Sequence, residues 1–286
     1  MPVKWSCEQL QRSVFQLNVP FTRNSKWSFE LLCISDLHLD SVHCNRKLLE
    51  KHLKEAVQRG AIIAIGDVMD AMQGRDDRRS CKSQLMAKYN VPNMWDALVV
   101  DCADWLSPFA QNFALMSRGN HEGAVLKYHE TDLIDRLIGR LNTLRKSNIQ
   151  YGNYAGWVRI VFKENGVNSG ARFVNLNYHH GTGYSKASAA IRRGGMLPDS
   201  DICIFGDKHV RWQEWVGRDR LTNYGQQYQD RQLHLAMPSY KNEYADGSTG
   251  HVVERGYRPG VMGGWWIRFF WDRAEQRVLF ETREAQ

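Results

Sequence analysis

The sequence predicts an α/β fold in which two central sheets face each other and helices lie outside them. Three observations predict it. Residues 27–35, 46–59 and 61–65 follow the strand–helix–strand order of a βαβ unit. Beyond residue 150 the apolar pattern changes from a helical period to the alternation typical of β-strands. Polar motifs follow the apolar runs directly, and open α/β sheets bind ligands beyond the carboxyl ends of their strands.

Each element follows from a local pattern. Gly60 ends the first expected helix, and Thr131 is the expected N-cap of the third. Helices are expected where apolar residues recur every three or four positions, at residues 46–59, 94–106, 131–144 and 184–193. Strands are expected at short apolar or alternating runs, at residues 27–35, 61–65, 113–117, 158–162, 174–178, 202–205 and 210–216, with a closing hairpin around 272–275.

Length and composition indicate one domain. The chain has 286 residues, of which 43% are hydrophobic, enough for one sizeable core. We expect a single domain over residues 1–286. Residues 1–26 are mixed and polar, and we expect a leader that packs on the surface. Residues from about 211 to 286 are expected to be a C-terminal elaboration of the domain.

The charge balance favours polyanionic partners. The net charge is +7 and the pI about 9.1, which suits nucleic acid, although a modest excess of Lys and Arg equally serves solubility. The six cysteines form no C-x-x-C pair, so no disulfide framework is expected. No signal core and no apolar run of about 20 residues occur, so we expect a cytoplasmic protein without membrane association. The oligomeric state is left open.

Polar motifs follow the expected strands at five places. Asp36 and His38 are separated by one residue, so they project to the same side of the chain and suit one metal ion. The same kind of motif then recurs along the sequence: Gly66-Asp67 with Asp70, Gly119-Asn120-His121-Glu122, His179-His180, and Gly206-Asp207-Lys208-His209.

In this order the motifs resemble the calcineurin-like metallophosphoesterase superfamily, of the phage or bacterial type and its nuclease or phosphodiesterase branch. The family pattern is Asp-x-His, Gly-Asp-x-x-(Asp/Gly), Gly-Asn-His-(Asp/Glu), a lone His and Gly-His-x-His. The resemblance covers about Leu31 to Val210. Asp207 departs from it, because the family usually has a histidine there. The resemblance implies a four-layer α/β/β/α sandwich of two facing mixed sheets, with a dinuclear metal site at the C-terminal ends of the strands.

The resemblance also implies a division of roles. Two cations about 3.5–4 Å apart neutralise a phosphate ester, lower the pKa of a bridging water and align its attack. Asp67 is the expected bridge, and His121 is the expected catalytic residue over the substrate. Asp70 or Glu122 would orient neighbouring groups. The expected ligands are Asp36, His38 and His209 for the first metal and Asn120, His179 and Asp207 for the second, together with Asp67.

Several choices stay open at this stage. His179 and His180 compete for one ligand position, and we expect His179 to take it. Asp207 either makes the second site harder, favouring Mn²⁺ or Fe over Zn²⁺, or leaves that site weak. The expected substrate-binding residues are Arg75, Arg118 and His180. The aromatic residues near the C-terminus are either stacking platforms for bases or core: Tyr240, Tyr244, Tyr257, Trp265 and Trp266.

The expected function is hydrolysis of nucleic-acid phosphodiester bonds by a dinuclear, metal-dependent phosphoesterase, with Mn²⁺ as the first choice of metal. The enzymatic alternative acts on a small nucleotide or a phosphomonoester. The alternative of another class is a non-catalytic, metal-binding scaffold on the same fold.

Overall fold

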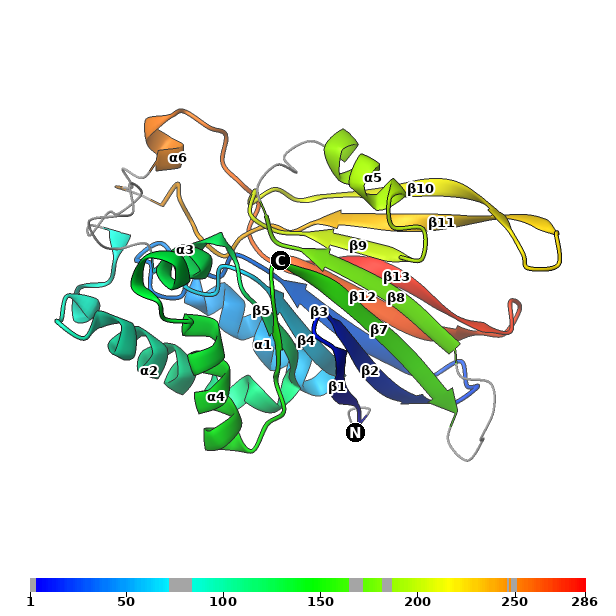
Figure 1. Ribbon diagram of the computed structural model, residues 1–286, viewed down its shortest axis with the longest axis horizontal. Helices are drawn as coiled ribbons and strands as arrows, with labels where there is room; N and C mark the ends of the chain where they lie inside the picture. The colour runs from blue at the N-terminus through cyan, green and yellow to red at the C-terminus, as the bar shows by residue number, and fades with distance from the viewer. Residues whose placement is uncertain (1–3, 72–83, 165–171, 182–186, 246, 248–250) are drawn as a thin grey trace.

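The computed structural model describes residues 4–71, 84–164, 172–181, 187–245, 247 and 251–286. Two mixed sheets stack face to face at the centre of the molecule (Figure 1). The seven-stranded sheet has the order β1 (Ser6–Gln11), β2 (Val14–Phe21), β7 (Ala155–Glu164), β8 (Arg172–His179), β9 (Ile202–Phe205), β11 (Gln227–Ala236) and β10 (Trp212–Leu221). The six-stranded sheet has the order β13 (Arg277–Ala285), β12 (Gly264–Asp272), β3 (Ser28–Ile34), β4 (Gly60–Ile65), β5 (Phe113–Ser117) and β6 (Gln150–Gly152).

Helices cover the outer faces. Four α-helices lie on the six-stranded sheet, and α5 packs on β10 and β11 of the other sheet (Figure 1). The expected four-layer α/β/β/α arrangement is therefore confirmed. The helices are α1 (Arg46–Arg59), α2 (Met94–Leu106), α3 (Asn120–His129), α4 (Leu133–Arg145), α5 (Ala187–Gly195) and α6 (His251–Glu254), with 3₁₀ turns at Ala87–Tyr89 and Ser107–Asn112.

Two apolar layers hold the sandwich together. One lies between the helices and the six-stranded sheet, and the other fills the space between the two sheets. In β3, alternate residues serve the two layers: Leu32 belongs to the first, and Leu31 and Cys33 belong to the second. This double burial explains why β3 and β4 are apolar along their whole length.

The helix limits follow the sequence closely. The first two expected helices have the observed limits, and the backbone N–H of Gly60 caps α1 by donating to the carbonyl of Ala56. The expectation for Thr131 was wrong. Asp132 is the N-cap of α4, because its carboxylate accepts the backbone N–H groups of Ile134 and Asp135.

The N-terminal segment is not a surface leader, and this prediction was wrong. Strand β2 pairs in parallel with β7, and its inward residues are fully or almost fully buried between the sheets. These residues alternate along the sequence, which is the pattern of a strand with one buried face. They are Phe15, Leu17, Val19 and Phe21.

The C-terminal segment is part of both sheets. Strand β12 pairs with β3 and β13, so the expected closing hairpin provides one end of the six-stranded sheet. Tyr240, Trp265 and Trp266 are buried and cannot stack on bases, whereas Tyr244 and Tyr257 are exposed. The five cysteines in the described residues are free. No helix in the described ranges is both long enough and apolar enough to cross a membrane.

Candidate metal centre

Five loops at one edge of the sandwich bring the motif residues together. Parallel strands β3, β4 and β5 end at the same edge, and β8 and β9 end there in the other sheet. The side chains that meet are Asp36 and His38 after β3, Asp67 after β4, Asn120 and His121 after β5, His180 after β8, and His209 after β9. Residues as far apart in sequence as His38 and His209 are thereby placed in contact.

The backbone of these loops is strained. Among the described residues, nine non-glycine residues have positive φ, and five of them belong to the motifs. A non-glycine residue in this region costs about 1–3 kcal/mol and persists where the surroundings impose it, most often at functional sites. For four of the five, this backbone conformation accompanies a side chain that lies in the ligand groups, and Asp207 is the exception. The five are Asp36, His38, Asp67, Asp207 and His209.

Two glycines allow the loops to approach closely. Gly66 has φ +75°, and a Cβ there would lie 2.3 Å from the ring of His180. A Cβ on Gly119 would lie 2.0 Å from Oδ1 of Asp67. Any side chain at these positions would displace His180 or Asp67, so the packing of the centre requires glycine at both.

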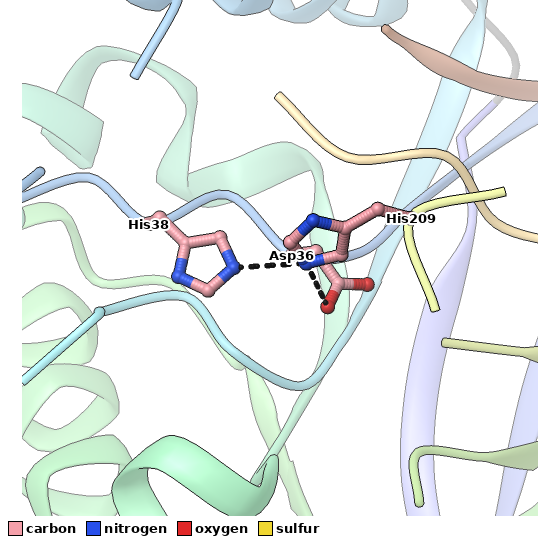
Figure 2. A group of neighbouring side chains, drawn as sticks. All are labelled: Asp36, His38 and His209. Carbon is pink, nitrogen blue, oxygen red and sulfur yellow. Dashed lines mark hydrogen bonds and ion pairs between the residues drawn. The ribbon is translucent and has the colours of Figure 1, made fainter. Parts of the chain in front are cut away.

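The first cluster contains Asp36, His38 and His209 (Figure 2). The Nε2 atoms of His38 and His209 lie 3.3 Å apart, and Nε2 of His209 lies 3.2 Å from Oδ1 of Asp36. Asp36 and His38 are buried, while the side chain of His209 is 23% exposed. One oxygen and two nitrogens therefore converge at the edge of solvent.

Asp67 lies between this cluster and a second group of side chains, which contains His121, His180 and Asn120. Its Oδ2 is 3.2 Å from Nε2 of His180 and 3.6 Å from Nε2 of His121. Its Oδ1 accepts the backbone N–H of His121 at 3.0 Å. Nε2 of His180 also lies 3.2 Å from Oδ1 of Asn120. Asp67 therefore contacts residues from two further loops, as the expected bridging position requires.

All four histidines of the centre share one orientation. In each ring, Nδ1 faces an oxygen acceptor and Nε2 faces the centre. The acceptors are the Asp70 carboxylate for His38 at 3.3 Å, the Asp70 carbonyl for His121 at 2.7 Å, the Ile65 carbonyl for His180 at 2.7 Å, and the Glu243 carboxylate for His209 at 3.4 Å. Metal-binding histidines are held in this way, because the outer hydrogen bond fixes the tautomer that leaves Nε2 free to coordinate.

Burial and charge shift the pKa values strongly. Burial disfavours a charged imidazole, but the carboxylates of Asp67 and Asp36 outweigh it and raise the pKa of His180 to about 10. Asp36 likewise outweighs burial and raises the pKa of His209 to about 10. Against burial, His121 and His180 lower the pKa of Asp67. Buried anions at this centre thus depend on neighbouring positive charge, which a metal cation also provides.

The donors fit divalent metal ions. Ligands bound at about 2.1 Å from one cation lie about 3.0–3.4 Å from each other in tetrahedral or octahedral geometry. The separations of 3.2 and 3.3 Å in the first cluster have this size. The donor set mixes imidazole nitrogen with carboxylate and amide oxygen, which suits Mn²⁺, Fe and Zn²⁺.

The choice of His179 over His180 was wrong. In β8, Leu176 and Tyr178 face the space between the sheets, so the alternation continues to His180. His179 lies on the other face, where burial and then the charge of Arg193 lower its pKa to about 4. His180 is fully buried within the cluster, so the expectation that it contacts substrate was also wrong.

Three other expected residues have different outcomes. The carboxylate of Asp207 pairs with Lys208 at 2.9 Å and is in none of the ligand groups formed by the described residues, although its backbone N–H donates to Asp36. The guanidinium of Arg118 donates to Asp132 and Asn153, both at 3.1 Å, a contact at the start of α4, and the expected substrate contact stays a prediction. Arg75 lies outside the described residues.

Two residues of the centre were missed. Nζ of Lys241, on a buried side chain, lies 2.9 Å from Oδ2 of Asp70, and Asp70 in turn holds His38 and His121. Glu243 holds His209. Both lie beyond the last motif, so no spacing rule indicated them. The expected orienting roles are observed as contacts. Asp70 contacts His38 and His121, and Glu122 accepts the backbone N–H groups of Asp67, Met69 and Gly119.

Comparisons with known proteins give only distant likenesses. Neither a protein-family model nor a curated protein matches the sequence. Among solved structures, Vps29 from Entamoeba histolytica, complexed with Zn²⁺, is 11% identical, with 90% of this chain and 100% of that chain covered and a TM-score of 0.36. Vps29 from Chaetomium thermophilum is 10% identical over 90% and 97%, with a TM-score of 0.40. A putative 5'-nucleotidase from Staphylococcus aureus is 12% identical over 90% and 53%, with a TM-score of 0.44. All three scores are below 0.5, so activity is inferred from the geometry of the centre alone.

Proposed function

We propose that this protein is a metal-dependent phosphoesterase of the calcineurin-like type, and that it hydrolyses phosphodiester bonds of nucleic acid. The observation that carries the proposal is the shared orientation of His38, His121, His180 and His209. Each has Nδ1 held by an oxygen and Nε2 turned toward Asp36 or Asp67, or toward another of these rings. Burial in a core gives four histidines no reason to share this orientation around buried carboxylates.

The centre divides into two half-sites. The first half-site is Asp36, His38 and His209, and the second is Asn120 and His180, with Asp207 as a further candidate ligand. Asp67 is shared between them. Divalent cations held here would supply Lewis-acid chemistry, neutralising phosphoryl oxygens and making water a better nucleophile. Oxygen donors in both half-sites favour Mn²⁺ or Fe as the metal.

His121 is placed to act on the substrate. Its side chain is 12% exposed, more than that of His38 or His180, so it lies on the open side of the centre. Although burial opposes it, the charge of Asp67 and the hydrogen bond to Asp70 raise its pKa to about 9. These contacts favour the protonated ring, with its Nδ1 proton held by Asp70. Its Nε2 proton is available to stabilise a phosphoryl oxygen or to protonate the leaving oxygen.

Nucleic acid as the substrate class rests on charge. The net charge of +7 favours a polyanion over a small nucleotide or phosphomonoester, which carries fewer charges. Bis-p-nitrophenyl phosphate compared with p-nitrophenyl phosphate separates diester from monoester hydrolysis. End-labelled DNA and RNA strands then distinguish a nuclease from an enzyme that acts on small nucleotides.

The experiment that tests the proposal combines metal analysis with turnover. We expect about two transition-metal ions per chain and hydrolysis of the diester. His121→Ala should abolish turnover and leave the metal content unchanged. His129→Ala removes a histidine from the other end of α3 and serves as the matched control. Full activity in His121→Ala would refute the catalytic role of that residue.

A non-catalytic scaffold is the second candidate, and one observation favours it. The Asp207 carboxylate lies outside the ligand groups of the described residues, which leaves the second half-site with few donors. A scaffold would bind metal but hydrolyse neither ester nor any labelled strand. Hydrolysis that depends on His121 would exclude it.

A further inference from the structure

A cleft of about 830 Å³ opens between the two sheets, away from the metal centre. Its walls include the start of β8 at Phe173 and the residue before β9, Asp201. The metal centre lies at the carboxyl ends of these same strands, so the two sites lie at opposite ends of the strands of the seven-stranded sheet. The size is within the range of about 300–1,000 Å³ that is usual for ligand sites.

The cleft is formed where the apolar layer between the sheets ends. Leu233 of β11 belongs to that layer, and Trp215 of β10 and Phe280 of β13 pack on its margin while partly exposed. The rings of Trp215 and Phe280 stack with centroids 5.6 Å apart and an interplanar angle of 21°. Tyr228 and Phe173, on the same walls, are 42% and 54% exposed. The core therefore continues outward as an open aromatic wall.

The same walls carry positive charge. The guanidinium of Arg231 lies 4.1 Å from the ring centre of Trp215, and in the described part of the chain it forms no ion pair. Arg172 and Arg277 also line the cleft. The carboxylate of Asp230 is taken by Arg218 at 2.7 Å, and Asp201 lies 3.7 Å from that arginine. The acidic residues are thus neutralised from outside the cleft. Arg277 pairs with Glu275 at 3.2 Å, so Arg231 is the cleft arginine on which the attraction of an anion rests.

We propose that this cleft binds a segment of single-stranded nucleic acid. A base stacks on the exposed ring of Tyr228, and Arg231, which lies over the Trp215 ring, pairs with a phosphate of the same segment. Aromatic platforms beside cationic side chains are the chemistry that holds single strands without sequence preference. An acidic peptide would use the arginines but not the flat aromatic faces. The proposal rests on the proposed function for its substrate class. It adds a second point of attachment for a long strand.

Binding is measured by fluorescence anisotropy on the metal-loaded full chain, with a labelled phosphorothioate oligothymidylate of about 10 nucleotides that resists hydrolysis. We expect Tyr228→Leu, which removes an exposed stacking ring, to raise Kd about 10-fold. Arg231→Gln, a change at an exposed position, should raise Kd and lower the slope of log K against log salt by about one. Arg12→Gln removes one exposed charge in the turn between β1 and β2, at the other edge of the same sheet, and should change neither quantity.

Equal Kd values for wild type, Arg231→Gln and Arg12→Gln would overturn the proposal, as would the absence of binding by wild type. A glutamate-rich peptide of equal charge that displaces the strand at equal concentration would overturn the assignment to nucleic acid. Hydrolysis of bis-p-nitrophenyl phosphate, measured on the same samples, should be equal in wild type and the three variants. Absence of this hydrolysis in wild type would refute the proposed function. The binding measurements would still test whether the cleft binds a single strand.

Discussion

The two proposed half-sites of the centre share Asp67 but differ in their donors. In the first, Nε2 of His209 lies 3.2 Å from the carboxylate of Asp36 and 3.3 Å from Nε2 of His38. The second has the amide oxygen of Asn120 and the imidazole of His180, 3.2 Å apart. An amide oxygen is neutral and a weaker donor than a carboxylate. We therefore expect one tightly held cation and one held more loosely.

The surroundings of the half-sites differ in the same direction. The segment after β11 supports the first half-site: Ser239 Oγ donates to the carbonyl of Asp36 at 2.9 Å, and Glu243 holds His209. In the second half-site the neutral carbonyl of Ile65, in place of a carboxylate, faces Nδ1 of His180 at 2.7 Å, and the carboxylate of Asp207 pairs with Lys208. Affinity thus depends on outer contacts as well as on the ligands themselves.

The largest effect is expected for the residue that the half-sites share. Asp67→Asn keeps the shape of the side chain but removes the charge, so both half-sites should weaken. We expect diester hydrolysis to fall on the order of 10³-fold, equivalent to about 4 kcal/mol of transition-state stabilisation. Metal content by plasma mass spectrometry should fall for both ions. A variant that keeps two ions per chain would show that Asp67 is not shared.

The second half-site alone is tested by two neighbouring histidines. His180→Ala should lower activity about 100-fold, or about 2.7 kcal/mol, and release the loosely held ion, because it removes an imidazole of that half-site. His179→Ala should leave metal content unchanged, because its ring lies on the other face of β8. Calorimetric titration of each variant with Mn²⁺ checks this, and the reverse pattern would restore His179 as the ligand.

A smaller effect is expected for the missed lysine. Lys241→Met removes the buried ammonium that lies 2.9 Å from Asp70, and Asp70 then holds His38 and His121 less firmly. We expect kcat to fall about 10–100-fold with both ions retained. Lys51→Met, an exposed change on α1, is the control. Unchanged kcat would mean that Asp70 needs no support from Lys241.

The smallest effect is expected on the free energy of unfolding at acid pH. It distinguishes protonation of a core histidine from loss of metal. His234 is buried, and burial followed by the charge of Arg218 lowers its pKa to about 4. The unfolded chain takes up this proton near pH 6.5, whereas the folded chain does so only near pH 4, so stability falls as pH drops between these values. His234→Gln should reduce that loss in urea unfolding at fixed metal concentration. An unchanged pH slope would assign the acid loss to the half-sites instead.

The sequence predicts much of the fold because two signals are local. Hydrophobic period identified α1 and α2 with their observed limits, and the motifs after β3, β4 and β5 marked the edge where the centre lies. The surface leader was a misreading of a clear signal, since Phe15, Leu17, Val19 and Phe21 alternate as strand residues do. The same alternation, carried past Tyr178, would have identified His180.

Other features had no local signal. Lys241 and Glu243 reach the centre only because the chain returns across the edge after β11, a tertiary contact that no spacing encodes. Arg118 was expected to bind substrate, and the sequence carried no signal for its observed partners, Asp132 and Asn153, which come from other loops. The aromatic cleft required knowledge of which strands lie at the margin of the sandwich.

The most direct test is a calorimetric titration of chelator-treated protein with Mn²⁺, repeated on Asp36→Asn and on His180→Ala. We expect wild type to bind two ions with distinct affinities. Asp36→Asn should lose the tight event and His180→Ala the weak one. A single event in wild type, or the same loss in both variants, would contradict two half-sites that meet at Asp67.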